Sequence, residues 1–262
     1  MKGRYALITG AASGLGREIS FRLARAACHL ILVDKDQDGL EQTRDMLPGD
    51  MRKTCIIIAM DLARPGAADE LIRHCEGVEV DVLVNNAGFG VYGFFTDTDW
   101  KVEEAMLQLQ VLTLTHICKG FLPGMVDRGW GRILNVSSMA AFQPGPLMNV
   151  YYASKAYILS FTEALSNELK GTGVKATVLL PGLFNTNFAG TTARNSGSAE
   201  KKEKHASTTV GEVADQAMKA LLRGKRRVIP GWNNRLLAFF SRRLPVGLVM
   251  WILRRAQEKI RE

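Results

Sequence analysis

The stretch YYASK brings together two groups that can do acid–base chemistry. The phenol of Tyr151 stands four residues before the ammonium of Lys155, and a helical pattern over residues 149 to 170 places both on one side of its first turn. A phenol ionises near pH ~10, but an adjacent ammonium favours the phenolate and lowers the pKa. Tyrosine then becomes usable as a general acid or base. An isolated YxxxK pair is more often an ordinary surface pair, so the surrounding motifs decide its meaning.

A serine lies close to this pair in the expected fold. The run GRILNVSS ends a predicted strand and places Ser138 at its carboxyl end, 13 residues before Tyr151. There the Ser138 hydroxyl can hold a carbonyl oxygen while Tyr151 donates the proton. The two residues therefore predict proton transfer to or from a carbonyl or alcohol oxygen.

A glycine-rich turn follows the first predicted strand. TGAASGLG holds Gly10, Gly14 and Gly16, with Ser13 and Leu15 between them, and leads directly into a helix. Glycine allows backbone N–H groups to approach a pyrophosphate, and the helix N-terminus favours its negative charge. Such a turn can also be a plain connection between two elements, but its position between strand and helix favours dinucleotide binding.

Asp34 ends the second predicted strand, 18 residues beyond Gly16. An acidic side chain at this place accepts hydrogen bonds from the adenosine ribose hydroxyls and repels a 2′-phosphate. We therefore expect NAD as the cofactor. The neighbouring cation Lys35 leaves NADP open as an alternative.

Two further motifs follow predicted strands. MDLA places Asp61 and Leu62 after the third strand, and NNAG places Asn86, Ala87 and Gly88 after the fourth. Asn and Gly also favour plain turns. However, all these segments meet at the carboxyl edge of a parallel sheet, which is where ligands bind in open α/β folds.

The elements that must position these residues alternate along the chain. Short apolar runs are separated by connections of about 20 residues with helical periodicity. Near-continuous apolar strands indicate burial on both faces, so we expect a single-domain α/β fold, a doubly wound parallel sheet of the Rossmann type. The 262 residues and 47% apolar content are ample for such a core. The strand candidates are YALIT, HLILVD, TCIIIAMD, DVLVNNAG, GRILNVSS and VKATVLLPG.

The carboxyl-terminal part of the chain departs from this rhythm. Residues 201–262 hold 15 Lys/Arg against 5 Asp/Glu. We expect a catalytic domain over residues 1–230, with a mobile substrate loop at about 189–209, and a basic amphipathic tail over 231–262 that forms helix, break and helix. The uncharged run 244–253 is too short to span a bilayer. The tail either contacts an anionic membrane surface or packs over the substrate cleft or a subunit interface.

The cysteines and the amino terminus bear on the compartment. The four cysteines are far apart and form no CxxC pair, which fits buried thiols better than disulfides or a metal site. The first apolar stretch runs straight into the glycine-rich turn, so we expect no signal peptide, and the basic tail lacks a nucleic-acid motif. We expect a cytoplasmic protein, associated peripherally with the membrane if the tail binds lipid.

Taken together, TGAASGLG, NNAG, NVSS, YYASK and the later PG resemble the short-chain dehydrogenase/reductase family over roughly residues 3 to 190. The resemblance implies an NAD(P)-dependent enzyme that interconverts an alcohol and a carbonyl. It implies that Ser138 orients the substrate oxygen, that Tyr151 transfers the proton, and that Lys155 binds the nicotinamide ribose and lowers the tyrosine pKa. Further cofactor contacts are implied for Pro181, Gly182 and Thr186.

Two positions depart from the family pattern. Gln110 stands where a catalytic asparagine is usual, so we expect a slower or rerouted proton relay. Ala27 replaces a common glycine and should matter little.

The alternative to an enzyme is a cofactor-binding scaffold or redox-sensing regulator. The resemblance also implies a homodimer or homotetramer that pairs through the helices containing Gln110 and Tyr151. An apolar substrate pocket is suggested by Phe94, Phe95, Phe142, Leu147, Met148 and Phe188.

Overall fold

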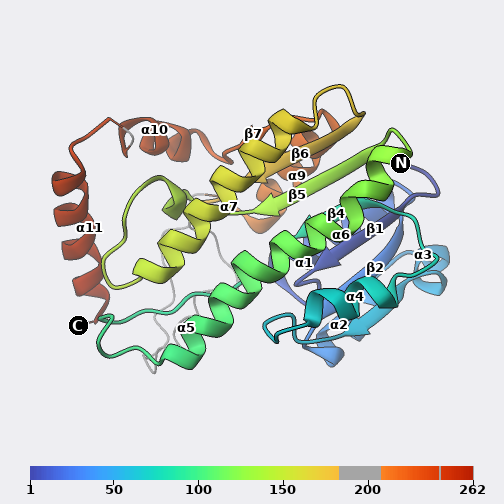
Figure 1. Cartoon of the computed structure of the whole chain (residues 1–262), viewed down its shortest axis with the longest axis horizontal. Helices are drawn as coiled ribbons and strands as arrows, with labels where there is room; N and C mark the ends of the chain where they lie inside the picture. Colours follow the sequence, from blue (N-terminus) through green and yellow to red (C-terminus); the bar gives the residue numbers. More distant parts are fainter. Residues whose placement is uncertain (183–207, 242, 262) are drawn as a thin grey trace.

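The fold is a seven-stranded parallel sheet with the strand order β3-β2-β1-β4-β5-β6-β7 (Figure 1). It is seen in a computed structural model that describes residues 1–182, 208–241 and 243–261. The expected doubly wound sheet is therefore confirmed, and the six predicted strands are all present. The strands are β1 Tyr5–Thr9, β2 His29–Asp34, β3 Ile56–Ala59, β4 Val80–Asn85, β5 Gly131–Val136, β6 Val174–Leu179 and β7 Arg227–Val228.

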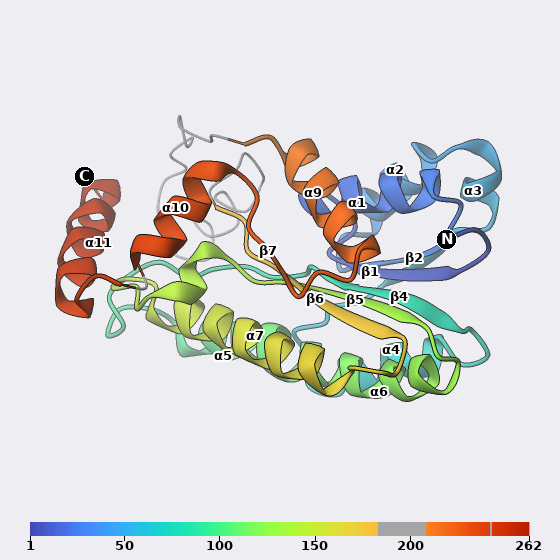
Figure 2. The same ribbon diagram turned by 90° about the horizontal axis from the view of Figure 1, so that it is seen from above.

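Helices cover both faces of the sheet in two layers (Figure 2). One layer holds α1 Gly14–Arg25, α2 Gln37–Asp45, α3 Gly49–Lys53 and α9 Val210–Leu222. The other holds α4 Ala67–His74, α5 Trp100–Leu107, α6 Leu114–Asp127 and α7 Asn149–Glu168. A π-helical segment, η1 Gln108–Thr113, joins α5 to α6, and the short 3₁₀ helix η2 Met139–Phe142 follows β5.

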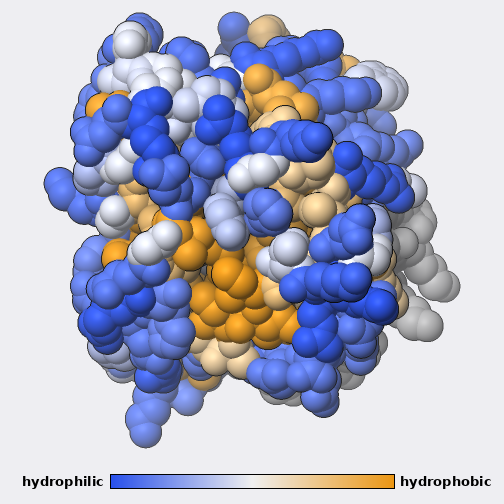
Figure 3. Space-filling view, turned by 90° about the vertical axis from the view of Figure 1, so that its right-hand side faces the viewer, coloured by the Kyte–Doolittle hydropathy of each residue, from blue (hydrophilic) through white to orange (hydrophobic). Residues whose placement is uncertain are grey.

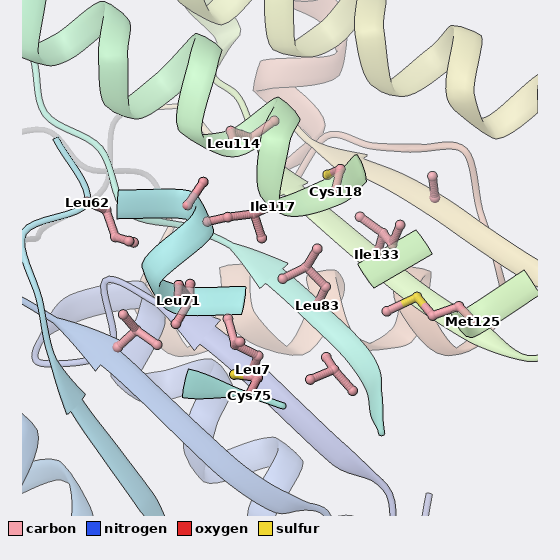
Figure 4. Packing of buried hydrophobic residues seen from close by; sticks show 14 of the residues in the cluster. Leu7, Leu62, Leu71, Cys75, Leu83, Leu114, Ile117, Cys118, Met125 and Ile133 are labelled. Carbon is pink, nitrogen blue, oxygen red and sulfur yellow. The ribbon is translucent and has the colours of Figure 1, made fainter. Parts of the chain in front are cut away.

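Two layers of apolar side chains hold the helices to the sheet. In one of them Leu7 of β1, Leu83 of β4 and Ile133 of β5 point toward α4 and α6 (Figure 4). Leu71 and Ile117 meet them from those helices, and all five are at most 1% exposed. This two-sided burial explains why the strands are almost continuously apolar.

The cysteines behave as core side chains. Cys28, Cys75 and Cys118 are buried thiols, as expected, and Cys55 is half-buried. Burial raises the pKa of the Cys118 thiol to about 12. A thiol held in its neutral form is a poor nucleophile.

The strands all end at one edge of the sheet, toward α10 Trp232–Ser241 and α11 Val246–Arg261 (Figure 1). Pro245 separates these two helices and accepts backbone bonds from Leu248 and Val249, so the expected helix, break and helix is confirmed. None of the described helices is long and apolar enough to cross a membrane. The opposite end of the molecule, where the strands begin, also shows hydrophobic side chains between charged ones (Figure 3).

The turn between α1 and β2 contains a conformational cost. Ala27 has φ of +58°, a left-handed conformation that costs a residue with a Cβ about 1–2 kcal/mol. Glycine at this place would avoid that cost. Alanine in place of glycine at position 27 therefore destabilises this turn, although the fold accommodates it.

Candidate active site

The glycine-rich turn is built around close backbone packing. Gly10 has φ of +68°, and a Cβ at Gly16 would collide with the carbonyl oxygen of Gly10. The Asn86 amide donates to the carbonyl oxygens of Thr9 and Gly10 at 3.0 and 3.1 Å. Ser13 is the exposed N-cap of α1, and its side chain caps no backbone N–H there. A narrow cradle with an exposed hydroxyl at a helix N-terminus suits a pyrophosphate.

Thr9 fastens this turn to the end of β4. Its hydroxyl oxygen accepts the backbone N–H of Asn86 at 3.0 Å and of Ala87 at 3.1 Å. Thr9 is therefore a positioning residue that sequence reasoning missed, although it is the first letter of the quoted glycine motif. Together these bonds bring two predicted motifs, on β1 and β4, to one place.

Asp34 stands beside the same turn at the end of β2. Its carboxylate accepts the backbone N–H of Ala12 at 3.1 Å and of Asp36 at 3.2 Å. Burial raises the pKa of this carboxyl, and the backbone bonds oppose that shift. Lys35 is exposed.

The other predicted strand-end residues lie at the same edge with bonds of their own. Asp61 accepts the backbone N–H of Ala63 at 2.9 Å, and the Leu62 carbonyl accepts the Thr113 hydroxyl at 3.0 Å. Pro181 is buried and accepts the backbone N–H of Met139 at 3.0 Å. Gly182 packs against Asn234 of α10. Thr186, Phe188 and the expected substrate loop up to residue 207 lie outside the described residues.

Ser138, Tyr151 and Lys155 come together as the sequence predicted. The Ser138 side chain is close enough to Tyr151 to lower the pKa of its hydroxyl, and the Ser138 oxygen accepts the backbone N–H of Ala140 at 3.1 Å. Lys155 lies one turn further along α7, with its Nζ 5.6 Å from the centre of the Tyr151 ring. The Ser137 hydroxyl, which the sequence did not single out, donates to the Lys155 carbonyl at 2.7 Å and ties α7 to the end of β5.

Burial, and not the lysine, dominates the pKa of Tyr151. It raises this pKa, and the nearby Ser138 hydroxyl only partly opposes the shift. Burial also lowers the pKa of Lys155 to about 7, and its Nζ donates to the Val136 carbonyl at 3.2 Å. Desolvation disfavours the charged form of both groups, so an ammonium that is itself partly neutral cannot stabilise a phenolate strongly.

Gln110 lies in the π-helical segment η1 and is fully buried. Its Nε2 donates to the Phe89 carbonyl at 2.7 Å, while its Oε1 has no hydrogen-bond partner among the described residues. A Cβ at Gly88 would lie 3.3 Å from Lys155 Nζ and 3.4 Å from Gln110 Oε1, so both atoms converge on Gly88. A buried acceptor without a partner is a natural place for a water, which is what a relay to Lys155 requires.

The carboxyl-terminal helix reaches this site through Gln257, which sequence reasoning missed. Its Nε2 donates to the Tyr152 hydroxyl at 3.2 Å, and its backbone carbonyl accepts the Tyr92 hydroxyl at 2.5 Å. Gln257 is buried, and the Tyr152 ring packs edge-on against Tyr151, 6.1 Å between centres. The end of α11 therefore lies one residue away from the Tyr151 phenol.

The aromatic residues expected to line a pocket do not gather in one cluster. Met148 and Tyr152 pack with Tyr151 in a small cluster of their own, whereas Phe142 packs against the main core. Phe95 is 60% exposed. The immediate wall around Tyr151 is nevertheless apolar, made by Val91, Met106, Ala140, Phe89, Val102 and Val150.

A doubly wound sheet with a dinucleotide cradle and a tyrosine–lysine pair at the same edge defines a nicotinamide-dependent oxidoreductase. The family model for short chain dehydrogenases matches residues 4–197. The chain therefore belongs to the short-chain dehydrogenase/reductase family and interconverts alcohols and carbonyls with NAD(P). The alternative of a non-catalytic scaffold or regulator is not favoured.

Individual relatives agree with this assignment. Ketoacyl reductase HetN of Nostoc sp. is 30% identical over 95% of this chain and 86% of its own length. Very-long-chain 3-oxoacyl-CoA reductase of Mus musculus is 28% identical over 92% of this chain and 81% of its own. A short-chain dehydrogenase from Sphingobium yanoikuyae in complex with NADPH has a TM-score of 0.79 and 28% identity, and covers 94% of this chain and 95% of its own.

Proposed function

We propose that Tyr151 is the general acid and base of this oxidoreductase and that the substrate is an apolar ketone or secondary alcohol. The observation that carries the proposal is that Tyr151 and Ser138 meet at the carboxyl edge of the sheet, where the Ser138 side chain lowers the pKa of the phenol. A substrate oxygen placed between the two side chains meets both hydroxyls at once. Ser138 then orients the oxygen while Tyr151 gives or takes the proton.

The cofactor supplies the hydride when it is bound, and the cradle supports its binding through Gly10, Gly16, Ser13 and Asp34. We propose that Lys155 holds the nicotinamide ribose and passes protons to a relay water located near Gly88 and Gln110. Its pKa of about 7 supports this role, because a group that titrates near neutral pH can accept and release a proton readily. Gln110 would hold the relay water through its unpaired Oε1.

We propose that NAD is preferred over NADP. The Asp34 carboxylate ends β2 beside the cradle, where it would repel a 2′-phosphate. The half-buried Arg17 lies on α1 just after the cradle, but its guanidinium is already bonded to the Thr43 hydroxyl at 2.9 Å and to the Gly39 carbonyl at 3.3 Å. The exposed Lys35 is the remaining cation that could favour NADP.

A long-chain 3-oxoacyl thioester is the substrate class that we propose within the apolar ketones. The names of the two curated relatives support it, since both are reductases of ketoacyl compounds. The apolar wall beside Tyr151 also supports it, because an acyl chain needs such a surface.

The test combines one substitution with two substrates. Tyr151→Phe removes the hydroxyl and keeps the ring, so NADH binding should persist while reduction of a long-chain 3-oxoacyl-CoA falls by about 10²–10⁴-fold. Tyr152→Phe is the matched control, and it should keep most of the turnover. Wild-type turnover by the Tyr151 variant would refute the assignment, and equal rates with short and long acyl chains would refute the substrate class.

We further propose that residues 1–230 form the catalytic domain and that the tail of residues 231–262 contacts an anionic membrane surface. The exposed aromatic residues and arginines of α10 and α11 support membrane contact.

We also propose that the chain is a homodimer or homotetramer. The exposed Leu112 and Tyr157, on η1 and α7, support pairing through those helices. Light scattering that showed only monomer would overturn the oligomer.

A further inference from the structure

Helix α10 borders a basic cavity whose lining includes none of Ser138, Tyr151 and Lys155. The cavity has a volume of about 580 Å³ and lies between η2, β7 and α10. It is lined by Phe142, Arg227, Ile229, Arg235, Ala238, Phe239 and Arg243. Three guanidinium groups around one hollow indicate a site for an anion.

Two of these three arginines are free to bind an anion. Arg227 is paired with Glu163 of α7, which neutralises it. Arg235 and Arg243 are exposed, and neither has a carboxylate partner within the described part of the chain. Arg235 donates to the Ile229 carbonyl at 3.0 Å, and Arg243 stacks on the Phe239 ring at 3.6 Å. Both side chains are thus oriented by the protein and keep further donors for a ligand.

The charge of the whole segment points the same way. Residues 216–257 contain ten Lys/Arg and no Asp or Glu. No acidic side chain of this segment can therefore compensate Arg235 and Arg243. The segment therefore favours a ligand with negative charge.

A second hollow on α10 is apolar and shares Arg235 and Phe239 with the first. Its volume is about 440 Å³, and it is lined by Trp232, Arg235, Leu236, Phe239 and Phe240. An anion-binding site and an apolar groove on either side of the same two side chains match an amphiphile, with its phosphate on one side and its acyl chains on the other. Free phosphate has no apolar group that could bind in the groove.

The apolar side of both tail helices faces outward. Trp232 is 70% exposed, and Phe240 and Trp251 are each 53% exposed. The helices are nevertheless fixed to the enzyme, because Ala238 of α10 and Val249 of α11 are buried. An outward apolar face on an anchored helix, flanked by arginines, fits the headgroup layer of a membrane.

We propose that Arg235 and Arg243 bind the phosphate of an anionic phospholipid in a membrane surface, with its acyl chains against Trp232, Leu236 and Phe240. The proposal rests on the membrane contact proposed above and names the headgroup site within it. It makes α10 a lipid-selecting element, whereas α11 adds apolar area.

The experiment measures sedimentation of the full-length protein with vesicles of phosphatidylcholine, alone or mixed with phosphatidylglycerol. The double variant Arg235→Gln, Arg243→Gln should bind the anionic vesicles about 30-fold more weakly, from about 1 kcal/mol for each arginine near the surface. Binding to phosphatidylcholine alone should be unchanged. The matched control is Arg223→Gln, Lys225→Gln, which removes the same charge at exposed positions after α9 and should bind like the wild type. NADH binding serves as the check that each variant is folded.

The outcomes separate the two proposals. If the wild type sediments with no vesicle, the membrane contact itself is wrong. If it binds anionic vesicles and both double variants lose the same amount, the attraction is general and the headgroup site is wrong. If soluble glycerol phosphate binds the wild type as tightly as the anionic vesicles do, the acyl chains contribute nothing, the site takes a free phosphoester and the lipid assignment is wrong.

Discussion

Replacing Lys155 by methionine should stabilise the cofactor-free protein while it removes cofactor-dependent turnover. Lys155 is 4% exposed, and its Nζ donates to the Val136 carbonyl. No carboxylate forms a salt bridge with its Nζ among the described residues. Methionine has a similar length and brings no charge into this buried place, so the folded state no longer carries a cost of desolvation.

The size of the effect follows from the pKa shift. Burial lowers the Lys155 pKa from 10.5 to about 7, and one pKa unit corresponds to about 1.4 kcal/mol, so the cost is at most about 5 kcal/mol. Loss of the bond to the Val136 carbonyl offsets about 1 kcal/mol of the gain. Because the folded pKa lies below the unfolded one, the unfolded state binds the extra proton between these two values. The cost is therefore absent above pH 10.5, grows as the pH falls, and is complete below pH 7.

Urea unfolding of the cofactor-free proteins tests this reasoning. The variant should be more stable than the wild type by about 4 kcal/mol near pH 7, and the difference should shrink toward about −1 kcal/mol near pH 10.5. Lys170→Met, at an exposed position just after α7, is the matched control and should change little at either pH. A stability difference between wild type and variant that does not depend on pH would refute the claim that burial dominates the charge of Lys155.

Three other substitutions test separate parts of the structure. Ala27→Gly should raise the free energy of unfolding by about 0.5–1 kcal/mol, because relief of the left-handed strain exceeds the added chain entropy. Ala26→Gly, at φ of −82° in the same turn, should lower the free energy of unfolding. Urea unfolding that ranks the two variants in the opposite order would contradict the reasoning. Asp34→Asn should shift the ratio of NADPH to NADH affinity at least about tenfold toward NADPH, since it removes a charge that repels the 2′-phosphate; an unchanged ratio in fluorescence titrations would exclude that role. Gln257→Leu should release α11 by about 1–2 kcal/mol through loss of the Tyr152 bond, seen as faster amide hydrogen exchange over residues 246–261; unchanged exchange would show that this bond does not hold the helix.

The meeting of the catalytic and cofactor residues could be predicted from the sequence because parallel strands share one carboxyl edge. Gly10, Asp34, Asn86 and Ser138 each follow a strand that the apolar pattern identified, and strand order alone then brings them together. The effect of Lys155 on Tyr151 could not be predicted in the same way. The size of this effect depends on how deeply the lysine is buried, and this is decided by packing between segments that lie far apart in the chain.

The parts that the sequence did not reveal depend on contacts over long separations. Strand β7 has only two residues, both half-buried, so no apolar run marks it. Gln257 meets Tyr152 across 105 positions of the chain, and nothing in the local pattern of α11 distinguishes it from other polar helix residues. Helical periodicity predicts which side of a helix is apolar, but not which neighbour that helix meets.

The sequence left two alternatives for the tail, a membrane surface or the enzyme's own cleft, and α11 makes them compatible. Gln257 is buried against Tyr152, whereas Trp251, six residues earlier on the same helix, is 53% exposed. Six residues of α-helix span about 9 Å, so one rigid element connects the outer apolar face to the residue beside Tyr151. A helix that shifts when Trp251 enters a lipid layer must move Gln257 with it, because the two side chains share one backbone. If the tail binds membranes as proposed, vesicles should therefore change amide exchange around Tyr152 in the wild type, and this effect should disappear in Gln257→Leu while vesicle binding remains.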